Sequence, residues 1–236
     1  MPPQTRTIEL KISDNTQMRA YVAQPAGASP AAGLLVFQEA FGVNDHMRSV
    51  TDRFAEQGYF AIAPELFHRS APAGFEGSYS DFAAVMPHYQ ALTNEGLLVD
   101  AQACFDWLTT QGVQNIGSVG FCLGGRVSFL ANSALPLKAA VSYYGGNIAP
   151  ALLPNAADQK APLLLHWGGL DKHITPPIIA SVEEALRASG KEYISSVYSK
   201  ADHGFNCDAR PTYHAESAQL AWSSTLTFLK LNLSKS

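Results

Sequence analysis

The segment Gly120-Phe121-Cys122-Leu123-Gly124 constrains the fold of this chain most strongly, because it stands between an apolar run and a stretch of helical period. A glycine two residues before and two residues after a nucleophilic residue is typical of a sharp turn from a strand into a helix. Strand and helix approach there too closely for larger side chains, and the central residue is held in a strained conformation. The segment therefore predicts a nucleophile elbow, with Cys122 as the candidate for covalent catalysis.

Apolar runs with strand character alternate along the chain with longer stretches of helical period. This alternation predicts an α/β fold with a mostly parallel sheet and helices on both faces. We expect strands at 7–12 and 18–23 (an opening hairpin), 33–37, 59–63, 115–121, 139–144, 162–167 and 193–198. We expect helices at 47–57, 94–111, 125–134, 176–189 and 213–231, and surface loops near the active-site mouth at 70–80 and 147–160.

Length and charge limit the remaining possibilities. A chain of 236 residues suits a single α/β domain over residues 1–236. A net charge of −4 without a basic cluster favours a small-molecule partner and argues against nucleic acid or a membrane surface. No apolar signal segment or membrane span is evident, so we expect a cytoplasmic protein, monomeric or weakly homodimeric. Three widely spaced cysteines predict reduced thiols.

A cysteine nucleophile needs a base and a carboxylate that orients the base, and in folds with such an elbow these follow in the order nucleophile, Asp or Glu, His. Asp171 comes just after the buried run 163–170, at the carboxyl edge of the predicted sheet. His203 follows the next strand, and Gly204 leaves its imidazole unobstructed. The purely structural alternative for Asp171 is a turn or helix-cap aspartate. Asp202 is the second candidate for the carboxylate that orients His203.

The other histidines and cysteines have ordinary explanations. We expect exposed histidines at 46, 68, 88, 173 and 214, and a hydrogen-bonded core histidine at 166. Cys104 lies on the apolar stripe of the helix at 94–111, and Cys207 has no elbow around it. Because thiol catalysis needs no metal, we propose no metal site.

Four separated segments of this chain resemble the dienelactone hydrolase family. They are Gln38 to Asn44, Gly120 to Gly125, the Gly-Gly-Leu loop that ends in Asp171, and the segment His203-Gly204-Phe205. The resemblance covers nearly the full length. It implies an α/β-hydrolase fold, no cofactor, and hydrolysis of an enol-lactone of the carboxymethylenebutenolide type. It also implies a triad with Cys122 as nucleophile, His203 as base and then acid, and Asp171 as the orienting carboxylate.

The resemblance implies further site residues. In the family, the glutamate that matches Glu39 pairs with the resting cysteine and moves away from it when substrate binds. The purely structural alternative for Glu39 is a helix-start or salt-bridged carboxylate. The backbone N–H groups of Leu123 and Ala40 are the expected oxyanion hole. Substrate contacts are expected from Ala40, Phe41, Leu123, Tyr144 and Phe205. Aromatic residues that either line a weakly polar pocket or belong to the core are Phe41, Phe75, Tyr79, Phe82, Tyr143, Tyr144 and Phe205.

The sequence departs from the family in its arginines. The family binds the substrate carboxylate with two arginines, but residues 74–90 contain no Lys or Arg, and the first basic residue after His203 is Arg210. Arg69 and Arg126 are candidate replacements or ordinary surface arginines. We therefore expect neutral esters and lactones to compete with dienelactone. The alternatives are a thioesterase, a carboxylesterase or a cysteine peptidase on the same framework, and a non-catalytic ligand or redox sensor.

Overall fold

The computed structural model describes residues 1–27, 30 and 32–234, which form two compact units, Met1–Ile116 and Gly117–Ser236. The prediction of a single domain stays a prediction. The first unit contains strands β1 (Gln4–Lys11), β2 (Gln17–Gln24), β3 (Ala32–Phe37) and β4 (Tyr59–Pro64), with helices α1 (Asp45–Glu56), α2 (Phe82–Gln90) and α3 (Asn94–Thr110).

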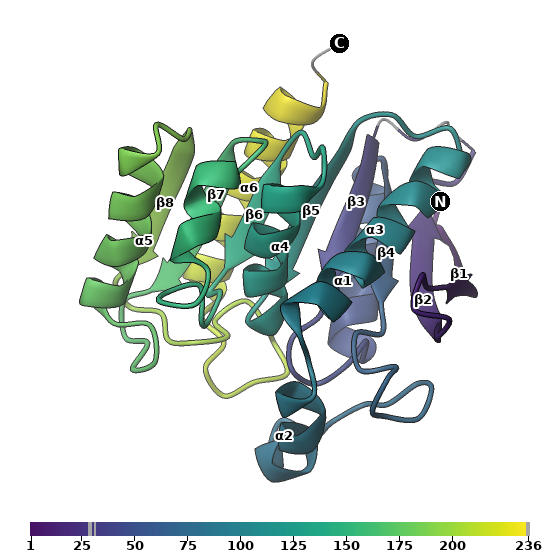
Figure 1. Cartoon of the computed structure of the whole chain (residues 1–236), viewed down its shortest axis with the longest axis horizontal. Helices are drawn as coiled ribbons and strands as arrows, with labels where there is room; N and C mark the ends of the chain where they lie inside the picture. Colours follow the sequence, from purple (N-terminus) through teal and green to yellow (C-terminus); the bar gives the residue numbers. More distant parts are fainter. Residues whose placement is uncertain (28–29, 31, 235–236) are drawn as a thin grey trace. The chain divides into compact units, whose positions relative to one another are not determined.

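The strands of the first unit lie in the order β1-β2-β4-β3. The predicted hairpin is confirmed, since β1 and β2 pair antiparallel from Gln4 opposite Gln24 to Lys11 opposite Gln17. β2 is also antiparallel to β4, whereas β3 and β4 run parallel. Both β3 and β4 are buried along their whole length, as their continuous apolar sequences predict. Helices α1 and α3 flank these strands (Figure 1).

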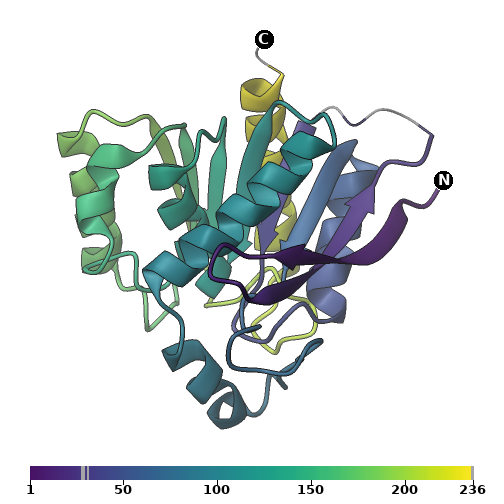
Figure 2. The same cartoon turned by 45° about the vertical axis from the view of Figure 1, so that its right-hand side comes forward.

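The second unit alternates strand and helix from β5 to α6, and its four strands form a parallel sheet in the order β5-β6-β7-β8. In the views of Figures 1 and 2, α4 and α5 lie on one face of this sheet and α6 on the other. The elements are β5 (Ile116–Phe121), α4 (Leu123–Ala134), β6 (Ala140–Tyr143), the 3-10 helix η1 (Leu153–Asp158), β7 (Leu163–Gly168), α5 (Pro176–Ala188), β8 (Tyr193–Tyr198) and α6 (Ala215–Leu233). This alternation confirms the predicted α/β class.

The helix boundaries follow from local capping. The Asn44 side chain accepts a hydrogen bond from the Met47 N–H at 3.2 Å, and Thr93 does the same for Gly96 at 3.0 Å, so α1 and α3 each begin at a capped turn. Gly112 follows α3 with a φ of 83°, a conformation that favours glycine and ends the helix. Cys104 is fully buried on α3, as predicted.

Two elements were not predicted. α2 lies in a stretch with only one buried residue, Val85, and with a proline, Pro87, inside the helix, so it lacks the apolar stripe that indicates a helix. It begins because the Asp81 side chain accepts a hydrogen bond from Ala84 N–H. η1 lies inside the segment that was expected to be an irregular loop, and short 3-10 turns of this kind leave little sequence signature.

Candidate active site

The elbow at Cys122 has the strained geometry that its glycines predict. Cys122 has a φ of 53° and a ψ of −112°, which non-glycine residues rarely adopt, and it is followed directly by α4. A Cβ at Gly120 would collide with the carbonyl group of Gly124. The Cys122 N–H donates to the carbonyl of Tyr143 at 3.0 Å, which ties the turn to β6. The thiol therefore stands at the N-terminus of α4, where helix N–H groups favour a negative charge.

Three side chains of the second unit meet in one chain of contacts. His203 Nε2 lies 3.1 Å from Cys122 Sγ, and His203 Nδ1 lies 2.7 Å from Asp171 Oδ2. Asp171 comes from the loop after β7, and His203 comes from the loop after β8. Parallel strands bring both loops to the carboxyl edge of the sheet. The three residues selected from the sequence are thus in contact.

Asp171 is held in place by the backbone as well as by His203. Its Oδ1 accepts hydrogen bonds from the N–H groups of His173 at 2.8 Å and Ile174 at 3.1 Å. Asp202, the competing carboxylate, accepts a hydrogen bond from the backbone N–H of His203 at 2.6 Å, whereas the imidazole ring of His203 is hydrogen-bonded to Asp171. The position of the ring therefore distinguishes the two carboxylates.

Burial and charge act against each other at this site. Burial alone would raise the pKa of Asp171, but the hydrogen bond and charge of His203 and the two backbone N–H groups hold that pKa below its ordinary value. Burial alone would lower the pKa of His203, but the negative charge of a Cys122 thiolate and the hydrogen bonds to Asp171 and Cys122 raise it to about 10. The site therefore favours the charged form of His203, which lies beside the Cys122 sulfur.

Tyr144 packs against the imidazole, and Phe205 packs against Tyr144. The Tyr144 ring stands edge-on to His203, with ring centroids 5.2 Å apart, and 5.3 Å from the ring of Phe205. Tyr144 also has a positive φ of 37°, and its N–H donates to the carbonyl of His166 at 2.7 Å. Both aromatic residues are fully buried, so they support the position of His203.

A buried polar network stands next to these rings. His166 Nε2 lies 3.1 Å from the Thr225 hydroxyl, and its Nδ1 lies 3.0 Å from the Tyr198 hydroxyl. Burial lowers the pKa of His166 to about 3, so the ring is neutral. His166 is the hydrogen-bonded core histidine that the sequence predicts.

Of the histidines that were expected to be exposed, His173 is exposed, whereas His88 and His214 are half-buried and two others are buried more deeply. His46 is buried on α1, because it shares the inward stripe of that helix with Val50. The His68 side chain is only 3% exposed, because its Nε2 lies 3.1 Å from the buried carboxylate of Asp100. The contact of His68 with Asp100 has no signal in the local sequence, because the two residues lie 32 positions apart.

The remaining predicted site residues of the first unit follow β3. Glu39 and Ala40 are buried directly after this strand, and Phe41 is buried among Tyr79 and Phe82, with ring centroids 4.6 Å and 6.1 Å away. The pairing of Glu39 with Cys122 and the oxyanion role of Ala40 stay predictions.

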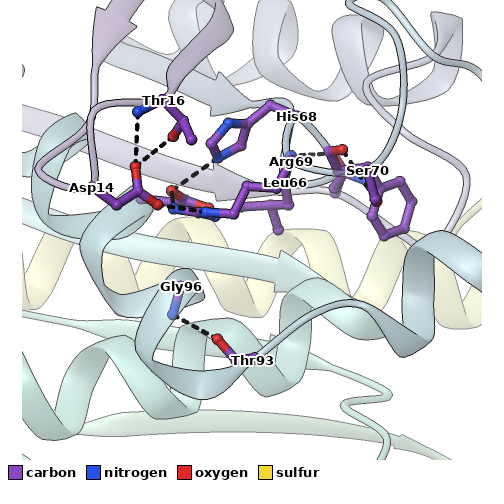
Figure 3. Close-up of polar contacts among 11 residues, drawn as sticks. Asp14, Thr16, Leu66, His68, Arg69, Ser70, Thr93 and Gly96 are labelled. Carbon is purple, nitrogen blue, oxygen red and sulfur yellow. Dashed lines mark hydrogen bonds and ion pairs between the residues drawn. The ribbon is translucent and has the colours of Figure 1, made fainter.

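Arg69 is hydrogen-bonded to two carboxylates of the first unit. Its guanidinium makes two hydrogen bonds to Asp100, at 2.8 Å and 2.9 Å, and its Nε donates to Asp14 at 2.7 Å. Figure 3 shows Arg69 turned toward Asp14, with His68 beside it. Arg69 is therefore neither a freely solvated arginine nor an available substrate ligand.

The guanidinium of Arg210 lies close to Gly204, the neighbour of His203, although Arg210 comes seven positions after His203 in the sequence. The chain turns back after His203, since the His214 N–H donates to the carbonyl of Phe205 at 3.0 Å. As a result, a Cβ at Gly204 would collide with the guanidinium of Arg210. Arg126 lies one turn after Cys122 on α4 and is partly exposed. Sequence spacing alone does not reveal the position of Arg210, because it depends on the turn.

Solved structures with the same architecture define the class of protein. A crystal structure titled "Putative Dienelactone Hydrolase" from Klebsiella pneumoniae is 32% identical and superposes with a TM-score of 0.85 over 95% of this chain and 98% of that chain. An acylaminoacyl peptidase from Pyrococcus horikoshii superposes with a TM-score of 0.73 over all of this chain and 43% of the peptidase chain. Because the two sequences are only 18% identical, this likeness supports the fold and not a shared activity. The chain has the α/β-hydrolase fold, as predicted.

Sequence comparison narrows the class to one family. Residues 18–233 match the Dienelactone hydrolase family. Relatives named "Putative carboxymethylenebutenolidase" include one from Methylorubrum extorquens, 38% identical over 86% of this chain and 73% of its own length. Another, from Yersinia pestis, is 36% identical over 91% of this chain and 84% of its own. The chain therefore belongs to the dienelactone hydrolase family and is a hydrolase of that family. Within the described residues, no helix is long and apolar enough to cross a membrane.

Proposed function

We propose that this hydrolase opens a lactone or carboxylic ester of the dienelactone type through a thioester on Cys122. The observation that carries the proposal is the contact chain from Cys122 Sγ through His203 to Asp171, with distances of 3.1 Å and 2.7 Å, built on a strained elbow. A sulfur nucleophile, a base in hydrogen-bond reach and a carboxylate on the far nitrogen are the parts that acyl transfer needs.

The acylation step uses the thiolate and the imidazolium together. Cys122 Sγ attacks the carbonyl carbon, and the electron pair of the carbonyl moves to its oxygen. When this intermediate collapses, the ring C–O bond breaks, and the leaving enolate or alkoxide oxygen takes the proton from His203 Nε2. The product is a thioester to Cys122, and His203 is left neutral.

Water completes the reaction in the second step. His203 Nε2 removes a proton from water, and the resulting hydroxide adds to the thioester carbonyl. Collapse expels the Cys122 sulfur and releases the carboxylic acid product, while Asp171 stabilises the imidazolium in both steps. The negative oxygen of each intermediate needs N–H donors, and the Leu123 N–H at the start of α4 is suited to this role. From the sequence we propose Ala40 N–H as the second donor.

The first arginine position of the family has no counterpart in residues 74–90, whereas the guanidinium of Arg210 lies beside Gly204, close to the second position. Arg69 is bound to Asp100 and Asp14, and residues 74–90 contain no Lys or Arg. Aromatic rings lie beside His203, since Tyr144 packs against it and Phe205 packs against Tyr144. We therefore propose that neutral or weakly polar lactones and esters are substrates beside the anionic dienelactone. Tyr144, Phe205, Phe41, Ala40 and Leu123 are the proposed contacts. The substrate is a small molecule, and we expect it to be met in the cytoplasm.

The test is turnover of cis- and trans-dienelactone, the methyl ester of each, a neutral short-chain ester and an acyl thioester. Wild type is compared with Cys122→Ala and with Cys104→Ala. Cys104 is a matched control because it is a fully buried thiol whose pKa is raised by burial and by the charge of Asp100. We expect Cys122→Ala to lower kcat by about 10⁴-fold or more and Cys104→Ala to retain most activity.

Each result from these substrates and variants tests a different part of the proposal. Activity that survives Cys122→Ala would contradict the cysteine mechanism. Dienelactone preferred more than about 100-fold over its methyl ester, close to 2.7 kcal/mol, would overturn the proposed tolerance for neutral substrates. Preference for the acyl thioester would favour a thioesterase on the same framework.

A further inference from the structure

A hydroxyl group on α6 joins side chains from three neighbouring strands of the second unit. Thr225 Oγ1 lies 2.7 Å from the hydroxyl of Tyr143 on β6 and 3.1 Å from Nε2 of His166 on β7. His166 Nδ1 lies 3.0 Å from the hydroxyl of Tyr198 on β8. α6 lies on the face of this sheet opposite α4 and α5 (Figures 1 and 2). These four residues form one chain of polar contacts across the sheet, which we call the Thr225 network.

The two tyrosines of the Thr225 network hold the ring of Phe205. The centroid of this ring lies 5.2 Å from that of Tyr198 and 6.3 Å from that of Tyr143. The ring of His166 contacts both tyrosines, with centroids 4.5 Å and 5.7 Å away. Phe205 is completely buried. Because its ring contacts both ends of the network, its position depends on the hydrogen bonds that orient the two tyrosines.

Phe205 connects the Thr225 network to the catalytic imidazole in two ways. Along the chain, it follows His203 by two residues. In space, its ring lies 5.3 Å from that of Tyr144, whose ring lies 5.2 Å from that of His203. Gly204 has a φ of 79°, and glycine leaves the backbone between the two residues flexible. The anchored ring of Phe205 therefore limits how far His203 can move.

We propose that Thr225 is a positioning residue for the reaction at Cys122, and that it acts on His203 through Phe205 and Tyr144. The proposal rests on the proposed function, because it assigns a role in the same acyl transfer. Proton transfer requires His203 Nε2 to stay within hydrogen-bond reach of Cys122 Sγ, which lies 3.1 Å away. A displacement of about 1 Å at such a contact can lower the rate by about 100-fold.

The chemistry of the Thr225 hydroxyl predicts which substitutions preserve this role. Burial lowers the pKa of His166 to about 3, so its ring is neutral, and one nitrogen donates while the other accepts. A hydroxyl fits beside Nε2 in either case, because it can donate to one neighbour and accept from the other. Serine keeps this hydroxyl, whereas valine keeps the shape of threonine and removes the hydroxyl. Thr225→Ser and Thr225→Val therefore separate hydrogen bonding from packing.

The test compares these two variants with wild type in two measurements. The first is kcat and KM for the substrate that wild type turns over fastest. We expect Thr225→Val to lower kcat about tenfold and to change KM less than about twofold, because the network acts on proton transfer. We expect Thr225→Ser to keep kcat within about twofold of wild type.

The second measurement is the titration of His203, followed by its imidazole nitrogen chemical shift. The contacts of His203 with Cys122 and Asp171 raise its pKa to about 10. In Thr225→Val these contacts are less well aligned, so we expect a lower midpoint than in wild type. In Thr225→Ser we expect the wild-type midpoint. A loss of stability alone would not move this midpoint.

Thr51→Val is the matched control, because it makes the same change at a completely buried threonine of α1, whose hydroxyl donates to the Met47 carbonyl at 2.7 Å. We expect it to leave kcat and the His203 midpoint unchanged. Tyr198→Phe is a second test variant, because it removes another hydroxyl of the network from a half-buried position and keeps the ring beside Phe205. We expect it to lower the midpoint in the same direction as Thr225→Val.

A wild-type His203 midpoint in Thr225→Val would overturn the proposal, whatever its kcat. So would equal changes in Thr51→Val, or a Thr225→Ser variant that is impaired like Thr225→Val. If Thr225→Val does not fold, Tyr198→Phe decides, and an unchanged midpoint in that variant overturns the proposal. The titration uses no substrate, so it tests the role of Thr225 even if the turnover measurements contradict the proposed function.

Discussion

Asp171 binds His203 with one carboxylate oxygen and the protein backbone with the other. Its Oδ2 accepts from His203 Nδ1 at 2.7 Å, while its Oδ1 accepts from two backbone N–H groups. This division fixes the carboxylate and, through it, the imidazole. Since Nδ1 must donate to Asp171, Nε2 is the nitrogen that faces Cys122 and exchanges protons with substrate.

The first prediction is that Asp171→Asn lowers kcat/KM by about 10³ to 10⁴-fold with little loss of fold. The backbone N–H groups require the amide oxygen at the Oδ1 position, so the amide NH₂ would face His203 and force its Nδ1 to accept. Nε2 would then carry a proton and be unable to receive one. Asp202→Asn is the control, since an amide oxygen still accepts from the His203 backbone N–H. Comparable losses in both variants would contradict the assignment.

The second prediction concerns the protonation of His203. Its pKa is raised to about 10, so the imidazolium should persist above neutral pH and lose its proton only near pH 10. The negative charge of Cys122 is the strongest cause that raises this pKa. Removing it in Cys122→Ser should therefore move the titration toward the ordinary value of 6.5. The measurement is imidazole nitrogen chemical shift against pH. His166 provides an internal reference that stays neutral throughout, because burial lowers its pKa to about 3. A His203 midpoint near 6.5 in wild type would contradict the ion pair.

The sequence predicted what depends on local chemistry. Glycine spacing located the elbow at Cys122, and the order of carboxylate and histidine located Asp171 and His203, because parallel strands carry their following loops to the same edge of the sheet. It did not predict α2, whose apolar pattern is absent, or the proximity of Arg210 to Gly204, which depends on a turn ten residues long. It also did not predict that Asp100 pairs with His68 and Arg69, since these partners lie about 30 residues apart in the chain.

The third prediction tests the cluster around Asp100. Its carboxylate is completely buried and depends on Arg69 and His68 for hydrogen bonds. Arg69→Met leaves this charge with one partner, and we expect a loss of about 3 kcal/mol in the free energy of unfolding, measured with urea. Adding Asp100→Leu removes the unpaired charge and should recover much of the loss. Asp14→Asn is the control, because Asp14 lies at the surface and its loss leaves the Asp100 pair intact. No recovery in the double variant would contradict this account.

The last prediction separates the geometry of the elbow from its chemistry. In Gly120→Ala, the added methyl group would collide with the carbonyl group of Gly124, which is backbone and cannot move aside without opening the turn. We expect a loss of about 3 kcal/mol or more in the free energy of unfolding, together with loss of the contact between Cys122 and His203. Gly146→Ala is the control in the same unit, since a Cβ there meets nothing within 4 Å. Alkylation of Cys122 by iodoacetamide at neutral pH reports the contact, because the imidazolium of His203 favours the reactive thiolate. We expect Gly120→Ala to be alkylated more slowly than wild type, and Gly146→Ala to be alkylated at the wild-type rate. Equal rates in all three proteins would contradict the view that the strained turn holds the Cys122 thiol against the imidazole of His203.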